Sequence, residues 1–274
     1  MSNILLPKVL IAVPTFNRAH TILKTLQSVH NQDYQNWELI ILDNNSKDNT
    51  RDLIVRKFSH DKRIKYKFYK DHVSLLENWQ RAYEFIKKDH KYFKFLCSDD
   101  ALKPEFLKEA VNTLEKTEDE IFGYTSNLIY IKDEKIFKKR KYGFFGFEKL
   151  ASIYIGNYVG CPSAMLLKTK DLIKIDNDPC FMYAGDIYHA LRYYSKGKKI
   201  IFDEQFLVFF QIGNNDSETN SMFGTKTMIK DKQSMRLTII PQIYSGVIKR
   251  IAILLAYFFY FLELIFFRIY NFLK

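Results

Sequence analysis

The feature that most constrains the fold is a series of apolar runs, three of which end in a cluster of polar residues. The clearest runs are residues 8–13 (KVLIAV), 37–42 (WELIIL) and 92–96 (YFKFL), and a weaker one covers 63–69. Short runs rich in β-branched and aromatic residues are typical of strands buried on both faces of a sheet. Segments expected to be helical, at 19–29, 48–58 and 74–87, separate these runs, so the order of elements predicts a mostly parallel α/β sheet with helices on both faces. Further along the chain, residues 199–202 and 206–211 are expected to form two more strands.

The polar clusters follow three of the predicted strands: PTFNR at 14–18, DNNS at 43–46 and SDD at 98–100. In open parallel sheets, ligands bind beyond the carboxyl ends of the strands, which meet at one edge. Adjacent Asp99 and Asp100 repel each other unless protons or a cation neutralise them. A divalent ion that also binds a diphosphate is therefore the natural partner of this pair.

Two further residues in these clusters suit a nucleoside. An ionised Asp43 only accepts hydrogen bonds, which fits the N3–H of a uracil-type base or a ribose hydroxyl. Phe16 offers an aromatic face to a base. Each residue also has an ordinary structural role open to it: a turn at Asp43 or at Asp99-Asp100, and packing at Phe16. Three clusters on one edge favour a binding site over three separate coincidences.

Several other classes of protein lack support in the sequence. No G-x-G-x-x-G follows the first strand, and no P-loop, G-x-S-x-G or H-E-x-x-H motif occurs. Three scattered cysteines are too few for a disulfide framework, which favours a reduced cytosolic compartment, and no signal peptide is visible. Basic residues do not interleave with aromatic ones as in a recognisable nucleic-acid-binding module, so we expect no nucleic-acid partner.

Three segments together resemble the family 2 glycosyltransferases with the GT-A fold: VLIAVPTFNRAHTI, ELIILDNNSKDNT and FLCSDDALKPEFL. Their order and spacing are similar to that family over residues 7–115, and a looser similarity extends to about residue 220. The resemblance implies an inverting transfer of a sugar from a nucleoside-diphosphate sugar to a hydroxyl group of a glycan. It also implies a place in cell-surface polysaccharide biosynthesis.

The resemblance assigns roles to individual residues. The nucleotide would be contacted by five of them: Pro14, Phe16, Asp43, Arg81 and Asp99. Asp100 would bind a divalent metal ion, Mn²⁺ or Mg²⁺, and Asp186 would act as the general base. Two departures from the family stand out. Cys97 occupies a position that is acidic in many relatives, and Gly213 or Asn214 replaces a frequent histidine.

Asp186 also has a structural role open to it, because it follows Gly185 and could cap a helix, a role compatible with catalysis. Burial among Met182, Tyr183 and Tyr188 would raise the pKa of the carboxyl towards a value useful for a general base.

The sequence predicts two halves of one catalytic domain and a tail. Residues 1–116 would bind the nucleotide sugar, residues 117–224 the acceptor, and residues 225–274 would form a helical, membrane-associating tail. The tail contains eight basic and two acidic residues, and 251–267 is apolar except for Glu263. We expect this segment to form a helix about 26 Å long, marginal for a hydrocarbon core of about 30 Å.

Polar residues of the tail fall on one arc of a helical projection, roughly 140° wide at 100° per residue: Lys249, Arg250, Tyr257, Tyr260, Glu263, Arg268, Asn271 and Lys274. This arrangement favours an amphipathic helix lying at the cytoplasmic face of the cell membrane, where a lipid-linked acceptor would reside. A spanning or re-entrant helix, and a helix packed on the catalytic domain or another subunit, remain alternatives.

Other functions are weighed against glycosyl transfer. A nucleotidyltransferase would need a Gly-rich phosphate loop near the N-terminus, which is absent. A catalytically silent sugar-nucleotide-binding or scaffold subunit of a glycan-assembly complex remains the main alternative, and Cys97 is the feature that favours it.

Overall fold

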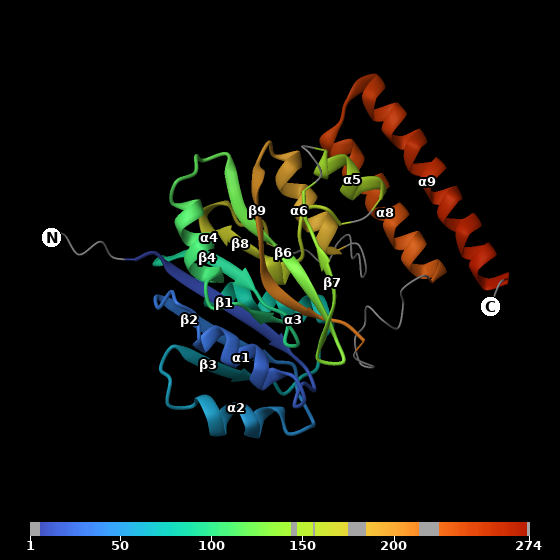
Figure 1. Cartoon of the computed structure of the whole chain (residues 1–274). Helices are drawn as coiled ribbons and strands as arrows, with labels where there is room; N and C mark the ends of the chain where they lie inside the picture. The colour runs from blue at the N-terminus through green and yellow to red at the C-terminus, as the bar shows by residue number, and fades with distance from the viewer. Residues whose placement is uncertain (1–5, 144–146, 156, 175–184, 214–224, 273–274) are drawn as a thin grey trace. The chain divides into compact units, whose positions relative to one another are not determined.

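The structure is a computed structural model, and it describes residues 6–143, 147–155, 157–174, 185–213 and 225–272. The chain divides into two compact units (Figure 1). Unit 1 combines Met1–Lys141, Pro162–Asn177 and Ile200–Gln211. Unit 2 combines Tyr142–Cys161, Asp178–Lys199 and Ile212–Lys274.

The described residues of unit 1 form a nine-stranded sheet in the order β3-β2-β1-β4-β8-β6-β9-β5, with β7 paired to β6. The strands are β1 (Lys8–Thr15), β2 (Trp37–Asp43), β3 (Ile64–Phe68), β4 (His90–Phe95), β5 (Ala101–Leu102), β6 (Ile121–Lys132), β7 (Lys135–Arg140), β8 (Met165–Lys168) and β9 (Lys199–Gln211). Strands β1 to β4 are parallel, whereas β8 is antiparallel to both β4 and β6. The predicted fold class, a mostly parallel α/β sheet with helices on both faces and a C-terminal helical tail, is confirmed, and the sheet is extended by antiparallel pairing through β8.

Four helices of unit 1 connect the parallel strands β1 to β4: α1 (Ile22–His30), α2 (Thr50–Phe58), α3 (Leu75–Gln80) and the 3₁₀ helix η1 (Arg81–Phe85). Helix α4 (Phe106–Leu114) lies between β5 and β6, and the 3₁₀ helices η2 (Pro162–Ala164) and η3 (Thr169–Asp171) flank β8. Every residue of β1 after Lys8 is buried, as expected for a central strand covered on both faces. One face packs on η1 through a cluster that includes Leu10, Ile40, Tyr83 and Phe93.

Three local predictions needed correction. The helix expected at 74–87 is α3 followed by η1, because the chain tightens into a 3₁₀ helix after Gln80. The two strands expected at 199–202 and 206–211 form one continuous strand, β9. The helix expected from Asp48 begins at Thr50, whose backbone N–H donates to Asp48 Oδ1 at 3.0 Å.

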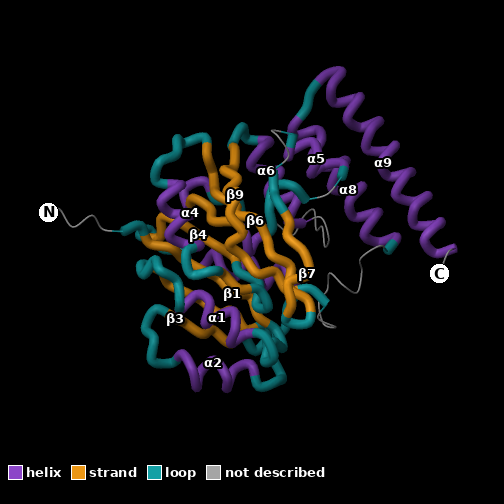
Figure 2. Tube along the Cα trace, viewed as in Figure 1, coloured by secondary structure: helices purple, strands orange, loops and turns teal. Residues whose placement is uncertain are grey.

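Unit 2 is built from α5 (Glu148–Tyr154), α6 (Gly185–Ser195), α8 (Lys226–Ile243) and α9 (Gly246–Phe272) (Figure 2). Its core joins all four helices through residues such as Ile153, Leu191, Ile239 and Ala256. Arg236 is 1% exposed and ties three of the helices together. Its guanidinium donates to the carbonyl oxygens of Ile153 and Tyr154 at 3.0 Å each, and it pairs with both oxygens of Glu263 at 2.9 and 3.0 Å.

Candidate active site

The three predicted polar clusters lie at one edge of the sheet in unit 1. Strands β2, β1 and β4 are neighbours in that order, and all three run in the same direction. Thr15 pairs with Asp43, and Leu96 N donates to Ala12 O at 2.9 Å, so the three strands reach this edge together. We call it the carboxyl edge.

Side-chain hydrogen bonds tie the loops of the carboxyl edge to one another. Ser46 Oγ accepts from Asn17 N at 2.9 Å, and Asn17 Oδ1 accepts from Lys47 N at 2.8 Å. Asn17 has φ 49°, in the left-handed region that asparagine tolerates better than most residues. Thr21 Oγ1 donates to Ser98 O at 3.0 Å and so connects the first loop to the third. The loops are therefore held in place before any ligand binds.

Asp43 is fully buried, and both of its carboxylate oxygens already accept hydrogen bonds. Oδ1 accepts from Ser46 N at 2.7 Å, and Oδ2 accepts from the Tyr66 hydroxyl at 2.6 Å. Burial and the Asp43 carboxylate raise the pKa of Tyr66 well above its ordinary value, so this hydroxyl remains a donor. Asp43 thus shapes the loop, and its contact with a base stays a prediction.

An exposed aromatic pair stands beside Asp43. Phe16 is 38% exposed, and its ring centroid lies 4.3 Å from that of His72. His72 Nδ1 lies 3.0 Å from Asn44 O, so this nitrogen carries the proton and donates to the carbonyl. The pair offers a ring face suited to a flat base. His72 follows β3 and is not among the predicted site residues, because its contact with Phe16 depends on packing between two loops that lie far apart in the sequence.

Arg81 begins η1 and reaches the loop that follows β2. Its Nη1 lies 3.2 Å from Asn44 Oδ1 and 3.3 Å from Asn78 Oδ1, and its guanidinium carbon lies 3.8 Å from the centre of the Tyr69 ring. A guanidinium held by stacking and amide oxygens is well placed for planar recognition. Its contact with a base or phosphate stays a prediction.

Asp99 and Asp100 follow β4 in a tight turn, in which Asp100 N donates to Cys97 O at 3.1 Å. Asp99 is partly buried, whereas Asp100 is 1% exposed. Asp100 Oδ1 accepts from Gln211 N, at the end of β9, at 3.0 Å. Its buried Oδ2 has no partner at hydrogen-bonding geometry among the described residues. Burial and the neighbouring Asp99 charge raise the pKa of Asp100 well above its ordinary value, although the Ser163 hydroxyl acts on the same carboxyl and partly offsets the rise in its pKa.

These features of Asp100 fit a metal ligand. A buried carboxylate oxygen without a donor is costly unless a cation or a proton compensates it. The described residues contain no group of three or more His, Cys, Asp or Glu that could hold a metal ion by themselves. Cys97 lies in the same turn, and its backbone N–H donates to Ser163 Oγ at 3.1 Å. A bound cation would therefore need oxygen ligands from substrate or water in addition to Asp100.

Pro14 lies inside β1, opposite Leu42, and is buried. A contact with a nucleotide at this position would involve its backbone more readily than its ring, and this role also stays a prediction.

Asp186 belongs to unit 2, in the first turn of α6. Its Oδ1 accepts from Ile187 N at 2.8 Å, and its Oδ2 accepts from Asn157 Nδ2 at 2.8 Å. The first bond occupies a backbone N–H in the first turn of α6, which begins at Gly185, so Asp186 lies inside the helix and is not its N-cap. The second bond fixes the orientation of the carboxylate. Of the aromatic neighbours expected around it, Tyr188 is partly buried on α6, whereas Met182 and Tyr183 lie outside the described residues, as does Asn214.

Two curated relatives share short segments with this chain. One is the GalNAc(5)-diNAcBac-PP-undecaprenol beta-1,3-glucosyltransferase of Campylobacter jejuni, 30% identical over 129 residues, which cover 47% of this chain and 40% of the relative. The other is the Escherichia coli UDP-Glc:alpha-D-GlcNAc-diphosphoundecaprenol beta-1,3-glucosyltransferase WfgD, 49% identical over 55 residues, covering 20% and 21%. The matched segments thus span less than half of either relative.

Solved structures agree in fold at low sequence identity. Staphylococcus aureus TarS in complex with UDP-GlcNAc superposes with a TM-score of 0.68 at 16% identity, covering 90% of this chain and 70% of TarS. A mannosyltransferase from Pyrobaculum calidifontis, in complex with GDP-Man and Mn²⁺, gives a TM-score of 0.64 at 14% identity, covering 92% and 74%.

The family model described as "Glycosyl transferase family 2" matches residues 10–176, which is more than half of the chain and includes all three loops of the carboxyl edge. The chain therefore belongs to glycosyl transferase family 2.

Proposed function

We propose that this glycosyltransferase moves a sugar from a nucleoside-diphosphate sugar to a hydroxyl group of a lipid-linked glycan, by a single displacement that inverts the anomeric carbon. The observation that carries the proposal is the carboxyl edge of unit 1, which brings together an exposed aromatic pair, a stacked arginine at the start of η1 and a buried carboxylate in the turn after β4. The two relatives, glucosyltransferases named for undecaprenol-linked glycans, support this class of acceptor.

The loops divide the donor between them. Phe16 and His72 would stack on the base, Arg81 would contact the base or a phosphate, and Asp99 would face the ribose. Pro14 and Asp43 would complete the nucleoside subsite, with Asp43 acting mainly through the loop that it holds. The prearranged hydrogen bonds among the loops reduce the ordering required when the donor binds.

Asp100 would hold a divalent ion, Mn²⁺ or Mg²⁺, through Oδ2. When bound, such an ion neutralises the charge that develops on a departing diphosphate. The mannosyltransferase from Pyrobaculum calidifontis, solved in complex with GDP-Man and Mn²⁺, supports a metal of this kind. The backbone N–H of Gln211 donates to Asp100 Oδ1 and holds the carboxylate in place, which leaves Oδ2 for the ion.

Asp186 would take the proton from the acceptor hydroxyl as that oxygen attacks the anomeric carbon. Asn157 holds the carboxylate in the first turn of α6. No covalent enzyme intermediate is needed in a single displacement, so no activated serine or cysteine is required.

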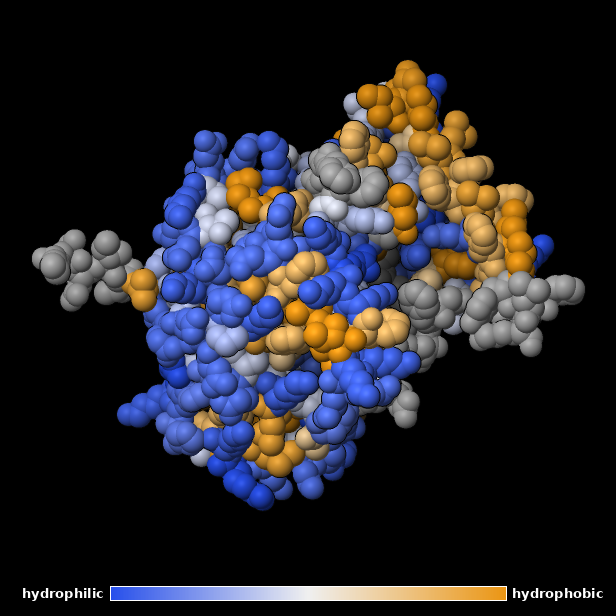
Figure 3. All heavy atoms as spheres, viewed as in Figure 1, coloured by the Kyte–Doolittle hydropathy of each residue, from blue (hydrophilic) through white to orange (hydrophobic). Residues whose placement is uncertain are grey.

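Helix α9 would attach unit 2 to the cytoplasmic face of the membrane. Residues 246–269 are long and apolar enough to cross a bilayer, and 11% of their most apolar window is buried. The side of α9 that includes Ala252, Ala256 and Glu263 packs inside unit 2. The exposed side forms an apolar stripe that includes Leu254 at 69% and Phe258 at 55% exposed (Figure 3). A helix with one packed side and one exposed apolar side fits peripheral attachment.

A donor screen tests the central proposal. The full chain, with Mn²⁺ or Mg²⁺, is heated in the presence of a panel of nucleotide sugars, and a specific donor is expected to raise the melting temperature. The selected donor is then incubated with a polyprenyl-diphosphate-linked glycan. Transfer that disappears in Asp100→Ala and Asp186→Asn supports the proposal, whereas full transfer by both variants would contradict it.

A catalytically silent sugar-nucleotide-binding or scaffold subunit is the second candidate. Cys97 in the turn of Asp99 and Asp100, together with the lack of a multi-residue metal cluster among the described residues, favours it. Donor binding without any hydrolysis or transfer, across acceptors and both metals, would support this candidate. Metal-dependent hydrolysis of the donor that is lost in Asp100→Ala would exclude it.

A further inference from the structure

A basic hairpin in unit 1 has no role in the proposed chemistry. Residues 132–141 include the turn between β6 and β7 and all of β7. They contain six Lys or Arg and two acidic residues, and so carry a net charge of +4 out of the +11 of the whole chain. The turn passes through Asp133 and Glu134, which both have positive φ. We call residues 132–141 the basic hairpin. Its charge is separate from that of the C-terminal helices.

Both sides of β7 combine an apolar side chain with cations. Alternate residues of a strand point to opposite sides, so Phe137 lies between Lys135 and Lys139, and Ile136 lies on the side of Lys138. Ile136 is 62% exposed and Phe137 is 59% exposed. Figure 3 shows hydrophobic surface over β7 surrounded by hydrophilic surface. Exposed apolar side chains framed by lysines are typical of surfaces that enter an anionic lipid interface.

The lysines of the basic hairpin are available to an anionic partner. Within the described part of the chain, no carboxylate forms an ion pair with Lys132, Lys135, Lys138 or Lys139. Lys138 Nζ lies 4.8 Å from the centre of the Tyr130 ring, and Lys139 Nζ lies 5.2 Å from the centre of the Phe206 ring. These ring contacts hold the lysines along the sheet while their charge remains uncompensated.

The basic hairpin projects from the carboxyl edge. Strand β8 is antiparallel to both β4 and β6, so β6 runs parallel to β4 and its end, at Lys132, points to the same edge as Asp99. Leu167 pairs with Phe93 of β4 and with Gly123 of β6, and from that level β6 continues nine residues to Lys132. Figure 1 likewise shows the β6–β7 turn on the side of the sheet where β1 ends.

We propose that the basic hairpin is a membrane contact of unit 1, which binds the surface of an anionic phospholipid bilayer and holds the carboxyl edge against it. Lysines would pair with headgroup phosphates, and Ile136 and Phe137 would enter the interface between headgroups and acyl chains. This contact involves other residues than the α9 attachment. Only its purpose rests on the proposed function, through the lipid-linked acceptor. It would bring the site to the surface where such an acceptor is embedded.

Vesicle binding by the full chain tests the proposal. The protein is sedimented with vesicles of phosphatidylcholine alone and of phosphatidylcholine mixed with phosphatidylglycerol, without donor or acceptor. We expect the double variant Lys138→Glu/Lys139→Glu to bind the anionic vesicles at least about tenfold more weakly than the parent, because each cation near such a surface adds substantially to binding. The variant Ile136→Ser/Phe137→Ser should weaken binding to the same vesicles, with a smaller change in its salt dependence.

A matched control separates local contact from net charge. Lys62 and Lys116 are exposed and precede β3 and β6, at the opposite edge of the sheet, so Lys62→Glu/Lys116→Glu makes the same change in total charge. This control should bind anionic vesicles nearly as the parent does. Equal weakening by the control and by the hairpin variant would overturn the proposal, and so would parent-like binding by the hairpin variants at an unchanged melting temperature.

Two further measurements ask whether the lysines of the basic hairpin bind a free diphosphate or only protect an edge strand. Loss of vesicle binding when inorganic pyrophosphate is added, with no dependence on phosphatidylglycerol, would mean that the hairpin binds a free diphosphate and would overturn the bilayer proposal. Aggregation of the variants with unchanged vesicle binding would show that the lysines only protect an edge strand, and would overturn it as well. A separate variant in α9, Leu254→Ser/Phe258→Ser, reports on the α9 attachment; its failure to affect binding would count against that attachment and not against the hairpin.

Discussion

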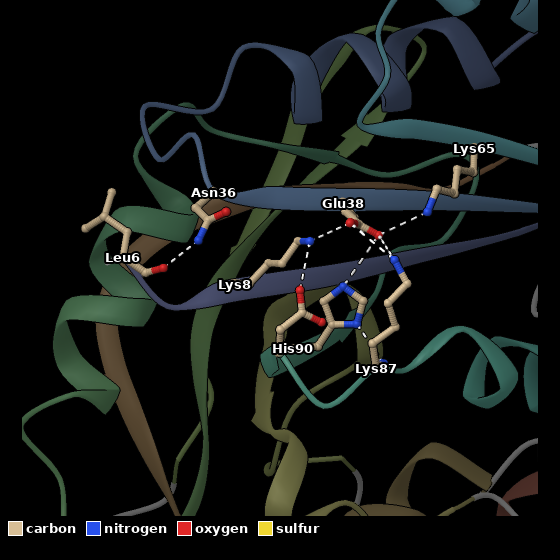
Figure 4. A network of polar contacts seen from close by, with 8 residues as sticks. Leu6, Lys8, Asn36, Glu38, Lys65, Lys87 and His90 are labelled. Carbon is tan, nitrogen blue, oxygen red and sulfur yellow. Dashed lines mark hydrogen bonds and ion pairs between the residues drawn. The ribbon is translucent and has the colours of Figure 1, made fainter. Parts of the chain in front are cut away.

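The two edges of the sheet in unit 1 use their carboxylates differently. The edge opposite the carboxyl edge, where the parallel strands begin, is the amino edge. There the carboxylate of Glu38 in β2 lies 2.5 Å from Lys8 Nζ, 3.3 Å from Lys65 Nζ and 3.2 Å from Lys87 Nζ (Figure 4). At the carboxyl edge, Asp100 is more deeply buried and its Oδ2 has no donor among the described residues. One edge satisfies its carboxylate internally, and the other leaves a carboxylate oxygen for a ligand.

The pKa shifts of the two carboxyls express the same difference. Partial burial alone would raise the pKa of Glu38, but hydrogen bonds from Lys8, Lys87 and Lys65 together lower it to about 2. Burial and Asp99 raise the pKa of Asp100. Ionised Glu38 therefore stabilises the fold, whereas ionised Asp100 opposes it, so the difference separates a structural charge from a functional one.

A hollow of about 630 Å³ at the amino edge is also lined by charged side chains that bind partners within the protein. Its basic lining includes Lys91, whose ammonium group lies 2.8 Å from Glu115, and Lys168, which donates to Glu118 O at 2.9 Å. These cations already have partners, so the hollow gives no evidence for a ligand.

Replacing Asp100 by asparagine should have the largest effect and tests whether this carboxylate is functional. We expect transfer to fall by a factor on the order of 10²–10⁴, because the ligand for the cation is lost. The melting temperature should stay the same or rise, because an ionised buried carboxylate is removed. Steady-state kinetics and thermal unfolding check both parts. A large loss of stability would mean that Asp100 has a structural role.

Replacing Glu38 by glutamine should have the opposite profile. The free energy of unfolding at neutral pH is expected to fall by about 1–3 kcal/mol, because three lysines lose a common partner. The transfer rate per folded molecule should be unchanged, since the residue lies at the edge away from the site. Urea unfolding and kinetics at saturating donor measure the two quantities, and a loss of rate at full stability would be evidence against the division of roles.

The pH dependence of the free energy of unfolding tests whether Glu38 is a structural charge. A carboxyl with a pKa of about 2 in the folded chain and about 4.5 when unfolded stabilises the fold above the unfolded value. This contribution is lost as the pH falls from about 4.5 to about 2. The difference in stability between the parent and Glu38→Gln should therefore shrink over this interval, and a difference that stays constant would contradict the assignment.

The smallest expected effect concerns the rim of the carboxyl edge. Phe16→Ala should raise the Kd for the donor by about tenfold, the scale of one stacking contact with a base. Stability should change little, because the ring is already 38% exposed. Calorimetric titration with the donor measures the change. The matched variant Phe137→Ala, on the basic hairpin, should leave the Kd for the donor unaltered.

The parallel strands and the family can both be predicted from the amino-acid sequence. Runs such as 8–13 and 37–42 can only be buried when both faces of a sheet are covered, which fixes a layered α/β fold. The rule that parallel strands end at one edge then predicts, without coordinates, that the loops of Phe16, Asp43 and Asp99 are neighbours. Both inferences depend on local composition and chain direction, which a sequence contains in full.

Which of these side chains already have hydrogen-bond partners can be seen only in the folded chain. Asp43 and Asp100 look alike in sequence, yet Tyr66, from the next strand, donates to the first, and Oδ2 of the second has no donor among the described residues. The same holds for Glu263, an isolated charge in an apolar segment that proves to be paired with Arg236. Hydrogen-bond partners from distant segments depend on three-dimensional packing, and one-dimensional spacing carries no record of them.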